Sequence, residues 1–109
     1  MGVKVTNNAT TTTVGAVSST ALSLTVASGT GALFPILGGS DYFYATLSDT
    51  NGNFEIVKVT ARTDDVMTIV RAQDGTLALP FPANSRFELR VTAANIMESF
   101  ISNYDFLLL

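Results

Sequence analysis

The sequence predicts a mainly β fold, a small antiparallel β-barrel or sandwich with an extended N-terminal arm and one C-terminal amphipathic helix. Three observations lead to this prediction. Residues 42–92 alternate between strand-like runs and turns, a polar stretch rich in Thr precedes them, and an apolar pattern with helical spacing follows them. The 109 residues fit one domain. Within it we expect the arm at residues 1–17, the β domain at 18–92, and the helix with its apolar tail at 93–109.

The N-terminal arm is the least apolar part of the chain. Residues 6–13 are polar and repetitive, with Thr at most positions. Thr favours an extended backbone, but this stretch offers no apolar face that could be buried. We therefore expect the arm to be disordered or to lie across a neighbouring subunit.

The first strand of the β domain is expected near residues 22–26. Leu22, Leu24 and Val26 alternate there with Ser23 and Thr25, which is typical of a half-buried strand. Further on, Pro35 keeps its segment out of the interior of a sheet. We expect the neighbouring Phe34 to close one end of the barrel or sandwich.

A β-hairpin is predicted for residues 42–62. The runs 42–48 and 54–62 flank a turn that contains Asn51-Gly52, and this dipeptide is a strong hairpin signal. Further strands follow at 66–71 and 86–92, the first of them after a turn at 63–65. Side chains alternate between the two faces of a strand. Phe43 should therefore share one face with Ala45 and Leu47, and Tyr42 and Tyr44 should share the opposite face.

The C-terminal helix is predicted from residue 93, with Thr92 as its N-cap. Two roles remain open for its apolar stripe. The stripe packs on its own sheet, which is the usual role of such a face, or it docks on another protein. The stripe follows i, i+3, i+4 spacing and consists of Ile96, Met97, Phe100, Ile101, Tyr104, Leu107 and Leu108.

Composition excludes several classes of function. Charged residues make up 14% of the chain, against about 25% in typical soluble domains, so we expect a partner to cover some apolar surface. The six Lys and Arg residues are scattered, which disfavours nucleic-acid binding. There is no Cys or His, no secretory signal region and no long apolar run. We therefore expect no thiol chemistry, no metal site, no cofactor and no membrane span.

The sequence contains no convincing catalytic constellation, and we expect a protein that is not an enzyme. Glu55 and Arg71 each lie within an apolar strand and should pair, because an unpaired buried charge is costly. Asp74, Gly75 and Thr76 fit a tight loop with Gly75 at positive φ. Too few carboxylates surround this loop for a calcium site.

Five spaced blocks within residues 32–92 carry a resemblance to known proteins. They are Leu33–Pro35, Tyr42–Leu47, Glu55–Arg62, Val70–Thr76 and Arg86–Thr92. Together they resemble a small β module of tailed-bacteriophage virion proteins, found in the N-terminal regions of tail fibres and in neck and head accessory proteins. The chain departs from the pattern at Ala72, where Gly usually follows Arg, and in the more apolar stretch 77–82.

The resemblance implies a virion structural protein, made in the host bacterial cytoplasm, with other virion proteins of the tail, portal, neck or capsid as partners. The first hypothesis is a tail, neck or fibre-anchoring adaptor that docks through its arm and C-terminal helix, as a homo-oligomer, a trimer or a ring. A capsid decoration (cement) protein is the alternative. A third hypothesis is a host-receptor or carbohydrate-binding module that uses Tyr42, Tyr44 and Phe54 as outward aromatics.

Overall fold

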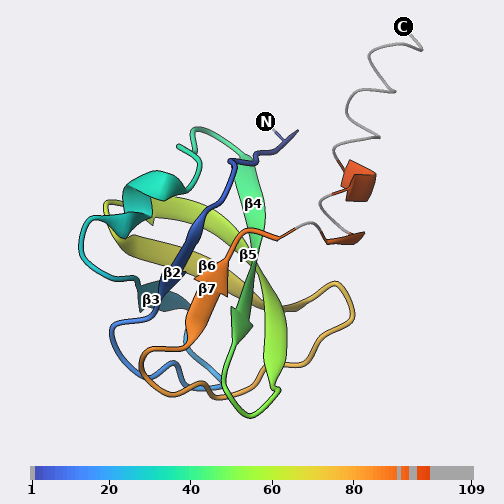
Figure 1. Ribbon diagram of the computed structural model, residues 1–109. Coiled ribbons are helices and arrows are strands. Elements are labelled where there is room, and N and C mark those ends of the chain that lie inside the picture. Colours follow the sequence, from blue (N-terminus) through green and yellow to red (C-terminus); the bar gives the residue numbers. More distant parts are fainter. Residues whose placement is uncertain (1, 91, 94–95, 99–109) are drawn as a thin grey trace, which may run out of the picture.

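The fold is built around one curled β-sheet, seen in a computed structural model that describes residues 2–90, 92–93 and 96–98 (Figure 1). Its elements, in chain order, are β1 (Gly2–Val3), β2 (Thr10–Thr12), β3 (Ser23–Thr25), the short 3₁₀ helix η1 (Thr30–Leu33), β4 (Asp41–Ser48), β5 (Phe54–Thr63), β6 (Val66–Gln73) and β7 (Arg86–Glu88). The predicted mainly β fold is confirmed.

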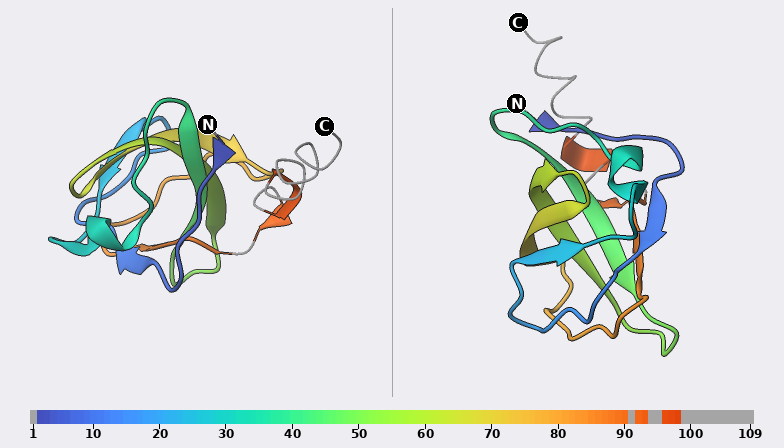
Figure 2. Two further views of the ribbon diagram at one scale, coloured as in Figure 1. Left: turned by 90° about the horizontal axis from the view of Figure 1, so that it is seen from above. Right: turned by 90° about the vertical axis from the view of Figure 1, so that its left-hand side faces the viewer.

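The strands follow the order β2-β7-β4-β5-β6-β3, and β1 pairs in parallel with the start of β4. The two ends of this order come together, because Thr13 and Val26 form an antiparallel bridge next to β2 and β3. The Ala27 N–H donates to the Thr12 carbonyl at 3.0 Å, and the Val14 N–H donates to the Thr25 carbonyl at 2.9 Å. The sheet is therefore a half-barrel whose edges touch, as the view from above shows (Figure 2).

The central hairpin of β4 and β5 follows the prediction. Phe43 pairs with Val59, and Ser48 pairs with Phe54 across the turn. Asp49 holds this turn, because its Oδ1 accepts from the N–H groups of Asn51 and Asn53 at 2.9 and 3.0 Å. Gly52 supplies the positive φ, 88°, that such a turn needs.

The core lies on the concave side of the sheet. Phe43 is fully buried there, and Phe34 stacks on it with ring centroids 5.7 Å apart. Phe34 also contacts Phe87 of β7, with centroids 5.2 Å apart. The aromatic cluster joins the loop after η1 to β4 and β7 and accounts for the burial of Phe34 that the sequence led us to expect.

The N-terminal stretch differs from the prediction. Residues 10–12, which we expected to be disordered or on a neighbouring subunit, form β2 and pair with β7 in the chain's own sheet. Thr11 and Thr13 are buried despite being polar. The Thr11 hydroxyl shares a hydrogen bond of 2.7 Å with the Thr30 hydroxyl, and the Thr13 hydroxyl accepts from the Ser85 N–H at 3.2 Å. Because each hydroxyl has a hydrogen-bond partner, these Thr side chains can be buried even though the stretch has no apolar face.

The end of the chain is described only in part. Residues 93 and 96–98 are helical, and the Ile96 N–H donates to the Thr92 carbonyl at 3.0 Å. Phe100, Ile101, Tyr104, Leu107 and Leu108 of the predicted apolar stripe lie outside the described residues. In the described part of the chain, no helix has the length and apolar character needed to cross a membrane.

We expect Gly31→Ala to destabilise the fold by at least about 2 kcal/mol, as overpacking of a buried position does. Gly31 is buried in η1, and a Cβ there would lie 2.0 Å from the Asp64 carbonyl oxygen. Gly15→Ala is the matched control, because a Cβ at Gly15 meets no atom within 4 Å. Urea unfolding of both variants tests this, and equal midpoints would contradict the close packing of η1 on the β5–β6 turn.

Candidate functional site

Three features of the described chain are candidates for a functional site. They are an ion pair in the sheet, a pair of tyrosines on β4, and a groove near the N-terminus. The ion pair joins β5 to β6. Arg71 Nε lies 2.8 Å from Glu55 Oε2, and Arg71 Nη2 lies 2.8 Å from Glu55 Oε1. The Glu55 side chain is fully buried and the Arg71 side chain is 7% exposed. The structure thus brings together the two charges that the sequence singled out.

The ion pair also holds backbone groups from three segments. Glu55 accepts from the N–H groups of Ala72 and Leu79, both at 2.9 Å. Arg71 donates to the carbonyl of Leu79 at 2.6 Å and to those of Ser18 and Ala21. All three guanidinium nitrogens and both carboxylate oxygens are therefore engaged, which makes this a structural junction with no open position for a substrate.

Burial alone would raise the pKa of Glu55, but the charged form is more strongly favoured here. The hydrogen bond from Arg71, the N–H groups of Leu79 and Ala72, and the Arg71 charge together hold the pKa of Glu55 below its usual 4.5. The carboxylate is therefore ionised at neutral pH and unsuited to act as a general acid.

The predicted tight loop at residues 74–76 closes the end of β6. Gly75 has φ 81°, and Asp74 also adopts a positive φ, 51°. The Thr76 N–H donates to the Gln73 carbonyl at 3.0 Å, while the Thr76 hydroxyl accepts from the Ile56 N–H at 3.0 Å. The loop thus fastens β6 to β5.

Tyr42 and Tyr44 lie side by side on β4 and bind the same carboxylate. Their rings meet edge to face with centroids 5.7 Å apart. Both hydroxyls donate to Glu98, one to each oxygen, and the Tyr44 bond is 2.8 Å long. The Lys58 ammonium lies 4.3 Å from the centre of the Tyr42 ring, where a cation is favoured. We call this arrangement the tyrosine clamp.

The clamp keeps its hydroxyls protonated. Burial, followed by the hydrogen bond and charge of Glu98, raises the pKa of Tyr42 to about 12. The same causes, in the same order, raise the pKa of Tyr44. Both groups therefore remain hydrogen-bond donors to a carboxylate throughout the physiological range.

Phe54 does not join the two tyrosines. It pairs with Ser48 at the turn end of the hairpin, four residues along β4 from Tyr44, which is roughly 13 Å at about 3.3 Å per residue. Phe54 is 54% exposed, whereas Tyr44 is buried. The three aromatics that we expected to face outward do not form one stacking platform.

The clamp determines which side of the C-terminal segment, residues 92–98, faces the sheet. Glu98 is turned toward β4, while Ile96 and Met97 are 55% and 56% exposed. The usual amphipathic helix places its apolar side chains on the sheet and its charges in water. In the described part of this segment the arrangement is reversed, and the sequence pattern alone did not reveal Glu98 as the anchor.

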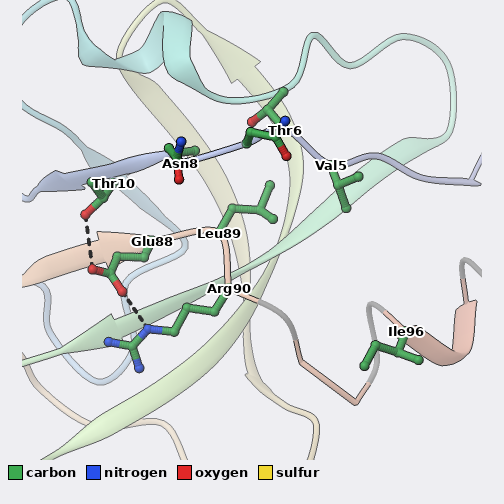
Figure 3. A pocket seen from close by; sticks show the side chains of 10 residues that line it. Val5, Thr6, Asn8, Thr10, Glu88, Leu89, Arg90 and Ile96 are labelled. Carbon is green, nitrogen blue, oxygen red and sulfur yellow. Dashed lines mark hydrogen bonds and ion pairs between the residues drawn. The ribbon is translucent and has the colours of Figure 1, made fainter.

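A groove of about 710 Å³ runs beside the clamp, between the N-terminal stretch and the end of β7. Val5 is on one wall, Leu89 and Arg90 are on the other, and Ile96 closes one end (Figure 3). The remaining lining residues are Thr6, Asn7, Asn8, Ala9, Thr10 and Glu88. Sequence reasoning missed this groove, because it forms only when residues 5–10 lie against β7.

Comparison with known proteins gives the chain no family: no family model matches it, and no curated protein matches it significantly. Within the residues that the structure describes, no three acidic, His or Cys side chains gather in a way that could hold a metal ion. What the geometry does offer is an apolar groove and a segment held with its apolar side chains outward.

We expect Glu55→Gln to cost roughly 3–5 kcal/mol at pH 7, because it leaves the Arg71 charge buried and uncompensated. The folded-state pKa of Glu55 is depressed, so its contribution is present above the unfolded value of 4.5 and is lost as pH falls through the folded value. The stability gap between wild type and variant should therefore shrink below about pH 4.5. Urea unfolding across pH 3–7 measures the gap.

Glu88→Gln is the control for this experiment. Glu88 pairs with Arg90 and Arg86, whose side chains are 44% and 62% exposed. A surface pair of this kind contributes under about 1 kcal/mol. Equal losses from the two substitutions would contradict the central role of the buried pair.

We expect the double variant Tyr42→Phe/Tyr44→Phe to release the C-terminal segment and leave the barrel folded. It removes two hydrogen bonds to a charged group, each worth about 1.5–3 kcal/mol. Hydrogen exchange at the Ile96 amide should then accelerate by at least about tenfold, since 1.4 kcal/mol is a factor of ten. Exchange in β5 should not change, and an unchanged rate at Ile96 would mean that the clamp does not hold the segment.

Proposed function

We propose that this chain is a non-enzymatic structural protein of a bacteriophage virion, an adaptor subunit of the tail, neck or fibre attachment that docks through its C-terminal segment. One observation carries the docking role. The tyrosine clamp directs Glu98 toward the sheet and leaves Ile96 and Met97 exposed. Exposed apolar side chains on a fixed segment favour burial against another protein surface.

The resemblance of residues 32–92 to phage virion modules supports a docking role within a phage particle. The low charge content, 14%, supports it too, because an assembled subunit can cover apolar surface that a free protein would expose to water. In the described chain, Ile36 and Leu77 are 82% and 74% exposed, and Leu77 belongs to the stretch that departs from the phage pattern. We propose localisation in the virion and assembly as a homo-oligomer with other virion proteins.

The decoration-protein alternative depends on an arm that reaches across capsid subunits. Residues 10–12 are paired with β7 and residues 2–3 with β4, so these parts of the arm are held on their own molecule. The carbohydrate-binding alternative needs free aromatic faces, yet Tyr44 is buried and the Lys58 ammonium lies over the ring of Tyr42. Both observations favour the adaptor.

Cryo-electron microscopy of the intact phage particle tests the proposal. We expect density for this chain at the portal, tail or baseplate. Density distributed over the icosahedral shell would favour the decoration protein instead. Absence of the chain from purified particles would overturn the virion role altogether.

Substitution of the exposed apolar side chains tests the docking surface. We expect Ile96→Asp/Met97→Asp to reduce incorporation into particles at least tenfold, because a charge buried at an interface without a partner is costly. Quantitative mass spectrometry of purified particles measures incorporation. Ile36→Asp is a control of at least equal exposure in the loop between η1 and β4, and equal loss in both variants would argue against a specific role for the C-terminal segment.

A further inference from the structure

Several polar groups in the walls of the groove beside β7 form hydrogen bonds within the chain. The Thr6 hydroxyl donates to the Leu33 carbonyl at 2.8 Å, and the Thr10 hydroxyl donates to Glu88 Oε1 at 3.1 Å. Glu88 also binds Arg90, so the two charges of the groove neutralise each other (Figure 3). A ligand that brought its own charge would have to compete with these bonds.

Apart from Asn7 and Asn8, the remaining side chains that line the groove are apolar. Val5 and Ile96 are 58% and 55% exposed, and Leu89 packs on the core from the opposite wall. A volume of about 710 Å³ lies in the range of pockets that enclose a ligand of several apolar groups, roughly 300–1,000 Å³. The groove therefore suits a short apolar peptide segment.

The chain itself contains a segment of this chemistry. Residues 99–109, which we call the tail, include Phe100, Ile101, Leu107 and Leu108, with Asp105 as the single charged side chain. A groove with neutralised charges and apolar walls matches such a sequence better than it matches a typical charged protein surface.

The position of the clamp argues against insertion of the tail into the groove of its own molecule. Ile96 already forms one end of that groove, and Glu98 is held on Tyr42 and Tyr44. The sequence after Glu98 contains no Gly or Pro that would reverse the chain.

We propose that the groove binds the tail of a second copy of this chain. Each copy then offers one groove and one tail, so that copies join head to tail in a ring or reciprocally in a dimer. This proposal rests on the docking role proposed for the C-terminal end of the chain and not on the virion setting. It names a second copy of the chain as the partner of the tail.

Cross-linking of the full chain tests the proposal directly, because the natural sequence contains no Cys. Two single variants, Val5→Cys and Leu107→Cys, are purified, distinguished by a mass tag on one of them, mixed and treated with a short bismaleimide. We expect a cross-linked species that contains one chain of each kind and that does not form when the mixture is diluted before the reagent is added. Ile36→Cys, mixed with Leu107→Cys, is the control, and we expect no such species from it.

Two other outcomes would overturn the proposal. A Val5→Cys/Leu107→Cys double variant that cross-links only within one chain would show the tail in its own groove. A monomer by light scattering at 100 μM or so, with no cross-link in any mixture, would show that copies do not associate even at a concentration far above the roughly micromolar range of moderate affinities. Neither result bears on the location of the chain in the particle, so the proposed function is tested independently by microscopy of the particle.

A substitution in the groove gives a second measurement. Val5→Asp places a charge on an exposed wall residue, and so the barrel should still fold. We expect the dissociation constant of the self-association to rise at least tenfold. An unchanged dissociation constant would place the interface elsewhere on the chain.

Discussion

The buried pair of Glu55 and Arg71 is the interaction on which the rest of the fold depends. It crosses from β5 to β6, and its remaining hydrogen-bonding groups hold the backbone at Ser18, Ala21 and Leu79. These loops meet at the bridge between Val17 and Phe81, which are both buried. Backbone groups in loops lack the hydrogen-bond ladder of a sheet, and the charge pair supplies partners for several of them at this end of the half-barrel.

The chain uses other carboxylates in the same way. Asp65, in the β5–β6 turn, accepts from the N–H groups of Gly29 and Gly31 at 3.0 and 2.9 Å and so fastens η1 to the sheet. Glu98 accepts from two tyrosine hydroxyls and fastens the C-terminal segment to β4. In a sequence with few charges, these three carboxylates each attach an irregular segment to regular structure. A carboxylate has two oxygens with several acceptor positions, and this geometry suits it to join two donors from separate places.

Sequence reasoning succeeded where the deciding chemistry is local. Asn51-Gly52 specifies a turn by itself, and a charge within an apolar strand requires a partner wherever the strand pairs. It failed for β2, because the partner of Thr10 is Glu88, 78 residues away, and the buried Thr hydroxyls find acceptors only in the folded chain. It also could not foresee that Ala72 adopts φ 56°, a left-handed conformation that Gly adopts more readily than Ala. Helical periodicity identified two faces in the C-terminal segment but not which of them would meet the sheet.

The reversed orientation of the C-terminal segment has an energetic consequence for association. Burial of the exposed parts of Ile96 and Met97 against a partner would contribute about 0.8–1.5 kcal/mol each, half of the value for full burial of such side chains. A free peptide would lose part of this gain, because ordering each residue costs about 1–2 kcal/mol. The tyrosine clamp already orders the segment in the free protein, so this conformational entropy is lost on folding and not on binding. A segment that is already ordered on binding loses less conformational entropy, so a small apolar contact can be sufficient for assembly when it is repeated in every copy of a symmetric array.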